Sequence, residues 1–555
     1  MLKFQVYDDE GRIADTVPIR NAYLIGADGS AMRGAIKFAD GVLQCEKRES
    51  GVAALALQQP CGDCGEVTVQ TCLLPEREEP YLLSLELARH RVMMLFNKAE
   101  DWGMFELEAG HAAKKRMEMA RKLFIEALCV AKDSPGKADG LAKKCLVVAI
   151  DGGEELTLEH AQRLLDRRRN AGVLPRRVMG TGAPIHTDHE FVKQAVLQHF
   201  DFVVMPTRWR DLAPEEGEYN WTRHENWAKW ARANQVPVIG GPLLSFSQLH
   251  VPDWLFIWEN DYETVRDLIY EHIERVVTKF KDVIEVWNVV SGLHVNSHFT
   301  VAFDQLMDLT RMATMLVRKV QPNARILVEI TQPFGEYYGS NQRSIPPMMY
   351  ADLLVQGGIN FDALSLRLLM GQSSPGQHTR DLMQISHLLD QYSGFGKPLH
   401  LVAAAPSSEV SAAMIRTAGT TRIDPNCGHW RRPWSPLVQG HWLEALLYIG
   451  FSKPYVDTVT WAELVDYPDI EMPTGGLISE NLQPKPSLQR LTAFRRSLAA
   501  DGAGKQMPPA ERQDEGAGDA TGGQGQGNDP KNDPQNSPQS DPKGGGGDHG
   551  NVAST

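Results

Sequence analysis

The strongest constraint on the fold is a regular alternation of short β-rich runs and helical stretches between residues 176 and 497. Runs rich in Val, Ile and Leu are followed by longer segments with apolar residues at helical spacing, such as Tyr262–Phe280 and Asp304–Val320. This β-then-α order favours parallel strands, because each helix returns the chain to the start of the next strand. The pattern predicts an α/β fold, a (β/α)8 TIM barrel over residues 176–497. The eight strand candidates are Val178–Ala183, Phe202–Met205, Val236–Pro242, Ile284–Val290, Ile326–Ile330, Ala363–Leu368, Leu399–Ala404 and Thr458–Trp461.

The first 104 residues have a different pattern, which predicts a β-sandwich of the shape that many carbohydrate-binding modules use. Apolar and polar residues alternate with period two in Leu2–Tyr7, Val67–Cys72 and Tyr81–Leu87. Residues 105–175 favour helix, with a break at Asp133–Gly136, and predict a helical connector to the barrel.

The last part of the chain, residues 498–555, is dominated by Gly, Asp, Asn, Gln, Pro and Ser. A segment of this composition buries too little apolar surface to offset the entropy lost on ordering. We therefore predict a disordered, acidic tail.

Charge and hydropathy narrow the class of partner. The net charge of −13 over 555 residues disfavours a nucleic-acid partner, which would need a basic face. No apolar run approaches the roughly 18 residues of a membrane-spanning helix. The first residues lack the basic and apolar regions of a signal peptide, so we expect a cytoplasmic protein without a membrane partner. A neutral substrate such as a sugar polymer is compatible with this charge.

Seven cysteines are scattered through the chain, and the only close pair is Cys61 and Cys64. With Cys45 and Cys72 nearby, a zinc site is one alternative, but no second C-x-x-C motif is present. The favoured interpretation is a hairpin turn between two strands. A metal at His294 and His298 is disfavoured because no acidic third ligand lies near them, and no motif calls for a cofactor.

Several motifs, in order along the barrel, resemble those of glycoside hydrolase family 10, the endo-β-1,4-xylanase family. Ile284–Gly292 is similar to the W-D-V-V-N-E motif of the family's fourth strand. The other similar segments are Leu212–Trp221, Gly240–Gln248 followed by Pro252–Leu255, Thr458–Trp461, and Gly476–Ile478 followed by Asn481–Pro486.

The resemblance implies two catalytic carboxylates, and this chain has neither. The general acid/base position holds Gly292, and the nucleophile position in Pro398–Ala405 holds Ala403. Retaining glycoside hydrolysis needs one carboxyl group as nucleophile and one as acid/base. We therefore expect hydrolysis to be absent or greatly reduced.

If hydrolysis survives, its carboxylates must come from other strand ends. Glu329 and Glu463 are the main relocated candidates, and Glu336, Glu409 and Asp466 are further ones. Burial in an apolar strand would raise the pKa of Glu329, as a general acid requires. The alternative is that Glu329 pairs with Arg367 or Arg343 inside the barrel.

Sugar contact is expected from aromatic and polar side chains at strand ends, because flat rings stack on pyranose faces. We predict Trp430 and Trp434 to be open and to form a groove wall, whereas Trp254 and Trp461 are expected in the core. The candidate substrate-binding residues are Arg208, Trp209, Gln248, Asn288, Trp430, Trp434 and Trp461.

Three functions remain open. The favoured one is a barrel that binds a polysaccharide or oligosaccharide without cleaving it. The second is hydrolysis with relocated carboxylates, and the third is a scaffold that binds a protein partner. A groove filled by Met205, Phe246 and Leu368 would support the scaffold. A serine hydrolase and a dinucleotide enzyme are disfavoured, because their glycine-rich motifs are absent.

Overall fold

The computed structural model describes the chain except for residues 49, 175–177, 373–375, 409–426 and 500–555. The candidate Glu409 and almost all of the predicted acidic tail lie outside the described residues. Within the described part, no helix is long and apolar enough to cross a membrane.

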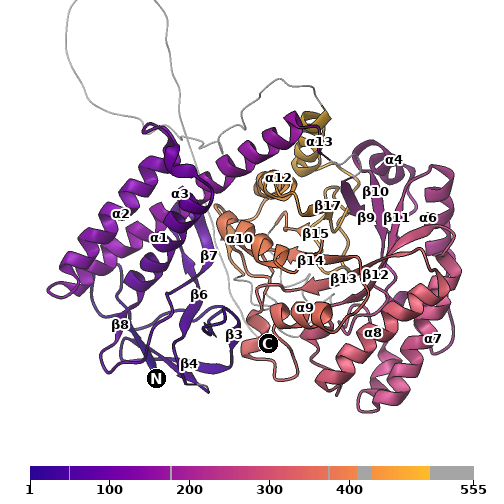
Figure 1. Ribbon diagram of the computed structural model, residues 1–555, viewed down its shortest axis with the longest axis horizontal. Coiled ribbons are helices and arrows are strands. Elements are labelled where there is room, and N and C mark those ends of the chain that lie inside the picture. The colour runs from indigo at the N-terminus through magenta and orange to yellow at the C-terminus, as the bar shows by residue number, and fades with distance from the viewer. Residues whose placement is uncertain (49, 175–177, 373–375, 409–426, 500–555) are drawn as a thin grey trace, which may run out of the picture. The chain divides into compact units, whose positions relative to one another are not determined.

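Residues 179–461 form a closed barrel of eight parallel strands, as the sequence predicts (Figure 1). Each strand pairs with the next one along the chain, and the last closes onto the first. The strands are β9 (Met179–Gly182), β10 (Phe202–Met205), β11 (Val238–Gly240), β12 (Ile284–Ser291), β13 (Arg325–Thr331), β14 (Ala363–Leu369), β15 (Leu399–Ala404) and β17 (Val456–Trp461).

Helices alternate with these strands and cover the outside of the barrel (Figure 1). In α7 (Tyr262–Phe280), Val265, Ile269 and Ile273 repeat at helical spacing and are buried. The Asp261 side chain accepts a hydrogen bond from the N–H of Thr264 and so begins that helix. The other helices of the barrel are α4 (Glu190–His199), α5 (Trp209–Leu212), α6 (Thr222–Ala233), α8 (Phe303–Val320), α9 (Pro347–Gln356), α10 (Leu382–Ser393), α12 (Pro436–Ser452) and α13 (Pro486–Ala499).

The N-terminal strands form two sheets, of order β4-β5-β1-β8 and β16-β7-β6-β2-β3. The strand β16 (His429–Trp430) comes from the loop after β15 of the barrel, and it pairs antiparallel with β7. The remaining strands are β1 (Leu2–Gln5), β2 (Tyr23–Ile25), β3 (Ala31–Met32), β4 (Gly34–Ala39), β5 (Val42–Lys47), β6 (Ala54–Pro60), β7 (Gly65–Gln70) and β8 (Tyr81–Leu82).

The helical part begins earlier than predicted, so the expected strand over Tyr81–Leu87 is wrong. Only Tyr81 and Leu82 are in β8, and α1 starts at Leu83 and runs to Asp101. The leucines of this run also fit a helical repeat, and the residues after them are strong helix formers. The helix α1 packs with α2 (Ala112–Val130) and α3 (Pro135–Asn170), which are separated by the predicted break.

Cys61 and Cys64 flank a short turn, η1 (Gly62–Cys64), between the antiparallel strands β6 and β7. The hairpin-turn interpretation is therefore confirmed. Among the residues that the structure describes, no group of three or more His, Cys, Asp and Glu side chains is placed to hold a metal ion.

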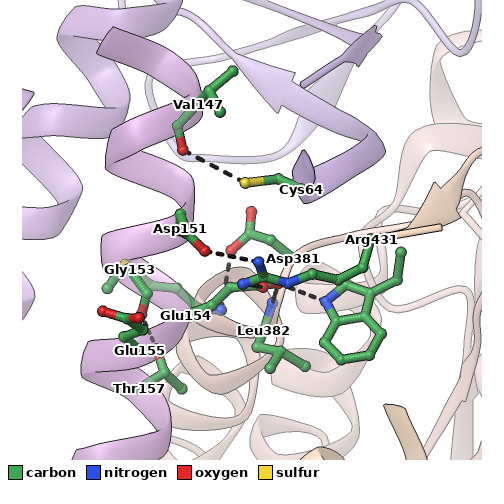
Figure 2. Close-up of polar contacts among 12 residues, drawn as sticks. Cys64, Val147, Asp151, Gly153, Glu154, Glu155, Thr157, Asp381, Leu382 and Arg431 are labelled. Atoms are coloured by element: carbon green, nitrogen blue, oxygen red, sulfur yellow. Dashed lines mark hydrogen bonds and ion pairs between the residues drawn. The ribbon is translucent and has the colours of Figure 1, made fainter. Parts of the chain in front are cut away.

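A buried polar network joins α3 to the barrel loops (Figure 2). Glu154 of α3 is about 1% exposed; it pairs with Arg431 and accepts hydrogen bonds from Trp430 Nε1 at 2.7 Å and from the N–H of Leu382 at 3.2 Å. Arg431 also lies 2.7 Å from Asp151 of the same helix. These contacts hold the loops after β14 and β15, and the loop after β14 borders the site described next.

Candidate functional site in the barrel cavity

A cavity of about 760 Å³ opens at the carboxyl ends of the barrel strands. Residues of all eight strands or of the positions directly after them line it, and most of those residues are small or polar. This face of a (β/α)8 barrel is where binding and catalytic groups collect. The lining includes Gly182, Asn288, Ser291, Glu329, Ser365 and Thr460.

Gly292 lines the cavity but has a backbone conformation that disfavours any other residue. Its φ is +64°, in the left-handed region, and it begins the short helix η4 (Leu293–Val295). A Cβ atom at this position would lie 2.5 Å from Thr331 Oγ1. The backbone at position 292 therefore disfavours a glutamate, as it does any residue with a Cβ atom.

Ala403 is fully buried and is not part of the cavity lining, whereas its neighbour Val402 is. Successive residues of a strand face opposite sides of the sheet. The expected nucleophile position therefore contributes no polar group to the cavity.

The carboxylate of Glu329 lies inside the barrel and is held by two hydroxyls. Ser291 Oγ donates to it at 2.7 Å and Ser365 Oγ at 3.0 Å. The three residues are directly opposite one another in neighbouring strands. The structure thus pairs Glu329 with two serines, and not with Arg367 or Arg343 as the alternative expected.

Arg367 instead pairs with Glu471, from the loop after β17. Its Nε and one terminal nitrogen both lie 2.8 Å from Glu471 Oε2, and Gln377 Nε2 donates to Glu471 Oε1 at 3.0 Å. Burial acts to lower the pKa of Arg367, but the charges of Glu471, Glu329 and Glu463 raise it above its usual value. The sequence analysis missed Glu471 and Gln377, since nothing local separates them from the other polar residues of their loops.

Glu463 lines the same cavity, directly after β17. Burial raises its pKa to about 7, partly opposed by the positive charge of Arg367. Its carboxyl group is therefore about half protonated at neutral pH and can donate a proton or a hydrogen bond.

Two histidines of the cavity, His250 and His400, are neutral at physiological pH. Both ring nitrogens of His400 bond to threonine hydroxyls, those of Thr458 and Thr460, and burial lowers its pKa to about 3. Burial also lowers the pKa of His250 to about 3, with the nearby arginines acting in the same direction. These rings serve as uncharged hydrogen-bonding groups.

Two further candidate carboxylates, Asp466 and Glu336, lie outside the cavity lining. Asp466 forms an ion pair with Lys485, which also donates to Ser407. Glu336 is buried against Arg380. Glu329 and Glu463 are therefore the two sequence candidates that the structure brings together in one cavity.

Three of the predicted binding residues, Arg208, Gln248 and Asn288, line the cavity. The Arg208 guanidinium is held by Asp211 at 2.7 Å and by the carbonyl of Asp469 at 2.7 Å. Asn288 is about 6% exposed, and its Oδ1 has no hydrogen-bond partner among the described residues.

The four predicted tryptophans do not line the cavity, and the expectation that Trp430 and Trp434 are open is wrong. They are about 5% and 6% exposed, because the first lies against Glu154 of α3 and the second donates to the carbonyl of Gly428. Trp209 stacks on His272 with ring centres 4.3 Å apart. Trp461 donates to the carbonyl of Gly475, and it is buried as expected. All four rings serve packing.

The pattern that would support a scaffold is also not found. Met205 and Leu368 are buried and do not line the cavity, and Phe246 borders a cavity that stays open. His294 is buried and bonds through Nε2 to the carbonyl of Thr331, whereas His298 lines the cavity.

Comparison with known proteins finds a family model and several xylanases that are similar to part of this chain. The model described as "Glycosyl hydrolase family 10" matches residues 178–328, from β9 into β13. "Endo-1,4-beta-xylanase A" of Xylanibacter ruminicola is 24% identical over 216 residues, which cover 36% of this chain and 55% of that protein. "Endo-1,4-beta-xylanase 3" of Hypocrea jecorina (strain QM6a) is 28% identical over 126 residues, which cover 22% of this chain and 35% of that protein. The chain thus spans about half the length of the first relative and less of the second.

Solved structures of xylanases also align with part of this chain. Xylanase 10B from Thermotoga maritima aligns with 62% of this chain and 99% of its own, at 16% identity and a TM-score of 0.43. A psychrophilic glycoside hydrolase family 10 endo-beta-1,4-xylanase aligns with 60% of this chain and 99% of its own, at 16% identity and a TM-score of 0.43.

Proposed function

We propose that this chain belongs to glycosyl hydrolase family 10 through its barrel, and that the barrel binds a β-linked saccharide of the xylan type without cleaving it by the family's two-carboxylate reaction. The relatives that are named endo-1,4-beta-xylanases support the choice of saccharide. The observation that carries the proposal is a cavity that keeps a polar lining while positions 292 and 403 hold no carboxylate.

The cavity suits a neutral, hydroxyl-rich ligand. It presents hydrogen-bond acceptors, which include the Glu329 carboxylate and the unpartnered Asn288 Oδ1. Sugar hydroxyls are donors and acceptors at once, so they can satisfy both kinds of group. The three arginines of the cavity lining all have an acidic partner: Glu471 for Arg367, Asp211 for Arg208 and Asp469 for Arg210. The site therefore offers little free positive charge to an anionic ligand.

Calorimetric titration with xylo-oligosaccharides, run beside a reducing-sugar assay, tests this function. We expect saturable binding and no release of reducing ends above a protein-free control. Asn288→Ala should weaken binding about three- to tenfold, the effect of one lost hydrogen bond. Asn234→Ala, at an exposed residue of the C-terminal end of α6, is the matched control and should leave the affinity unchanged. Absence of binding by the unaltered protein would overturn the proposal.

The second candidate function is hydrolysis with relocated carboxylates, and the raised pKa of Glu463 favours it. A neutral Glu463 could protonate the leaving oxygen while an ionised carboxylate of the cavity activates water or attacks the sugar. Reducing-sugar release that falls as the pH rises past about 7, and that Glu463→Gln abolishes, would replace the binding-only proposal with this one. The anomeric form of the first product, read by NMR, would then separate an inverting from a retaining route.

A further inference from the structure

The cavity continues down the barrel axis, past the strand ends. Its lining includes Ile239, Leu327 and His400. The same three residues line a second cavity, of about 450 Å³, at the other end of the barrel. That second cavity is bordered by residues at the start of strands, such as Arg325 of β13 and Asp457 of β17. Leu327 is the third residue of the seven-residue β13, and His400 is the second residue of β15. These side chains therefore form a floor deep inside the barrel.

Such depth is unusual for this fold, because layers of bulky side chains normally fill a (β/α)8 barrel. Here several lining positions carry small residues, namely Gly182, Gly241, Ser291, Ser365 and Ala462. The short side chains of Ser291, Ser365 and Ala462 leave room in the cavity, whereas a Cβ atom at Gly182 or Gly241 would meet a neighbouring backbone oxygen.

A polar atom without a partner in the described part of the chain lies at this depth. Asn288 stands opposite Leu327 in the β12–β13 register, at the level of the floor. Its Oδ1 has no partner in the described part of the chain, and the residue is more than nine-tenths buried. If the side-chain amide of Asn288 is flipped, its NH2 group, a donor, takes the place of Oδ1. A polar atom therefore faces the same surroundings in either orientation. The Glu329 carboxylate lies two residues further along β13.

We infer that the cavity takes the terminal ring of a β-linked saccharide end-on, along the barrel axis, with its hydroxyls bonding to Asn288 and Glu329. This inference rests on the proposed function and names the part of the saccharide that is recognised. A chain that continues at both ends would have to lie across the rim, and its rings could not reach a floor at Leu327 and His400. Only a chain end can enter a cavity closed at that depth.

The test is whether the amount of saccharide bound depends on the number of saccharide chain ends or on the total mass of saccharide. Xylobiose, longer xylo-oligosaccharides and soluble xylan are titrated against the full chain. End-on binding predicts a dissociation constant per chain that levels off after the first few sugars, and xylan that binds in proportion to its number of ends. Affinity per chain that keeps rising with length would overturn the inference but leave the proposed function standing. If none of these saccharides binds, both fail.

A pair of matched substitutions adds an independent measurement. Leu327→Phe adds volume at the floor, whereas Leu249→Phe adds the same volume in the loop after β11, where Leu249 is partly exposed and lines the rim. End-on binding predicts a loss of about tenfold or more for the floor variant and a small change for the rim variant. The reverse order of losses would contradict it. Because Leu327→Phe can disturb folding, its thermal unfolding is measured first, and the chain-length series decides the question if that variant does not fold.

Discussion

At the residue scale, Gly292 occupies the expected acid/base position with a backbone conformation that disfavours a side chain. The left-handed φ and the closeness of Thr331 mean that a glutamate at 292 would be strained in two ways. Restoring a carboxylate there would therefore not restore the geometry that a family acid/base has. By contrast, two serine hydroxyls hold the carboxylate of Glu329, and Glu463 lies in the cavity lining.

The cost of side-chain atoms at 292 can be measured by substituting alanine. Gly292→Ala should lower the free energy of unfolding by about 2 kcal/mol or more, from backbone strain plus the contact with Thr331. Gly396→Ala is the matched control, because Gly396 has a φ of +67° but nothing within 4 Å of its would-be Cβ atom. Urea denaturation should give a smaller loss for the control, and equal losses would show that the contact with Thr331 is relieved without cost.

Glu463 should make stability depend on pH. Its pKa is about 7 in the folded chain and near 4.5 in the unfolded chain, so the folded state binds more protons between these values. The contribution of Glu463 to stability is thus fully present below about pH 4.5 and is lost as the pH rises through about 7. Glu463→Gln keeps the neutral form at every pH, so its stability relative to the unaltered protein should increase between about pH 5 and about pH 8. Urea denaturation of both proteins across that range checks this, and a difference that stays constant with pH would contradict it.

At the element scale, the loop that carries β16 belongs as much to the N-terminal sheet as to the barrel. Its backbone extends that sheet through β7, and its Arg431 and Trp430 side chains meet Glu154 of α3 (Figure 2). Trp430, one of the two tryptophans predicted to form a sugar-binding wall, is buried by this contact. The strand β16 thus uses the ring of Trp430 for packing against the N-terminal part, and that ring is not open to a ligand.

Breaking this contact should cost far more than breaking a surface pair. Arg431→Met leaves the buried Glu154 carboxylate without its cationic partner, and it should destabilise the chain by about 3–5 kcal/mol. The control is Arg325→Met, because Arg325 and Asp457 form an ion pair with side chains 46% and 40% exposed. That change should cost about 1 kcal/mol or less. Similar losses in chemical denaturation would mean that Glu154 is solvated or finds another partner.

At the scale of the whole molecule, the described residues up to 499 belong to one compact unit. The N-terminal sheets, the helices α1 to α3 and the barrel share buried contacts, among them the ion pair of Arg91 with Asp381, 2.7 Å apart. A carbohydrate-binding module attached through a connector would be expected to fold independently of the barrel.

The shared contacts predict a single unfolding transition for the N-terminal part and the barrel. Calorimetry should give a van't Hoff enthalpy close to the calorimetric one, and residues 176–499 expressed alone should be unstable because β16 and Arg431 lose their partners. Two separated transitions, together with a stable isolated barrel, would contradict this prediction and would favour an independent N-terminal module.

The sequence by itself determined the barrel and the absence of a carboxylate at positions 292 and 403. Strand and helix periodicity are properties of short segments, so all eight strands could be placed before the structure was known, and Gly292 and Ala403 cannot supply a carboxylate in any fold. Only the tertiary structure decided that Trp430 and Trp434 are buried, that Glu471 pairs with Arg367, and that two serines hold Glu329. It also decided that the leucine run after Tyr81 forms a helix. These outcomes depend on which distant segments meet, and the pattern of a single segment carries no information about its eventual neighbours.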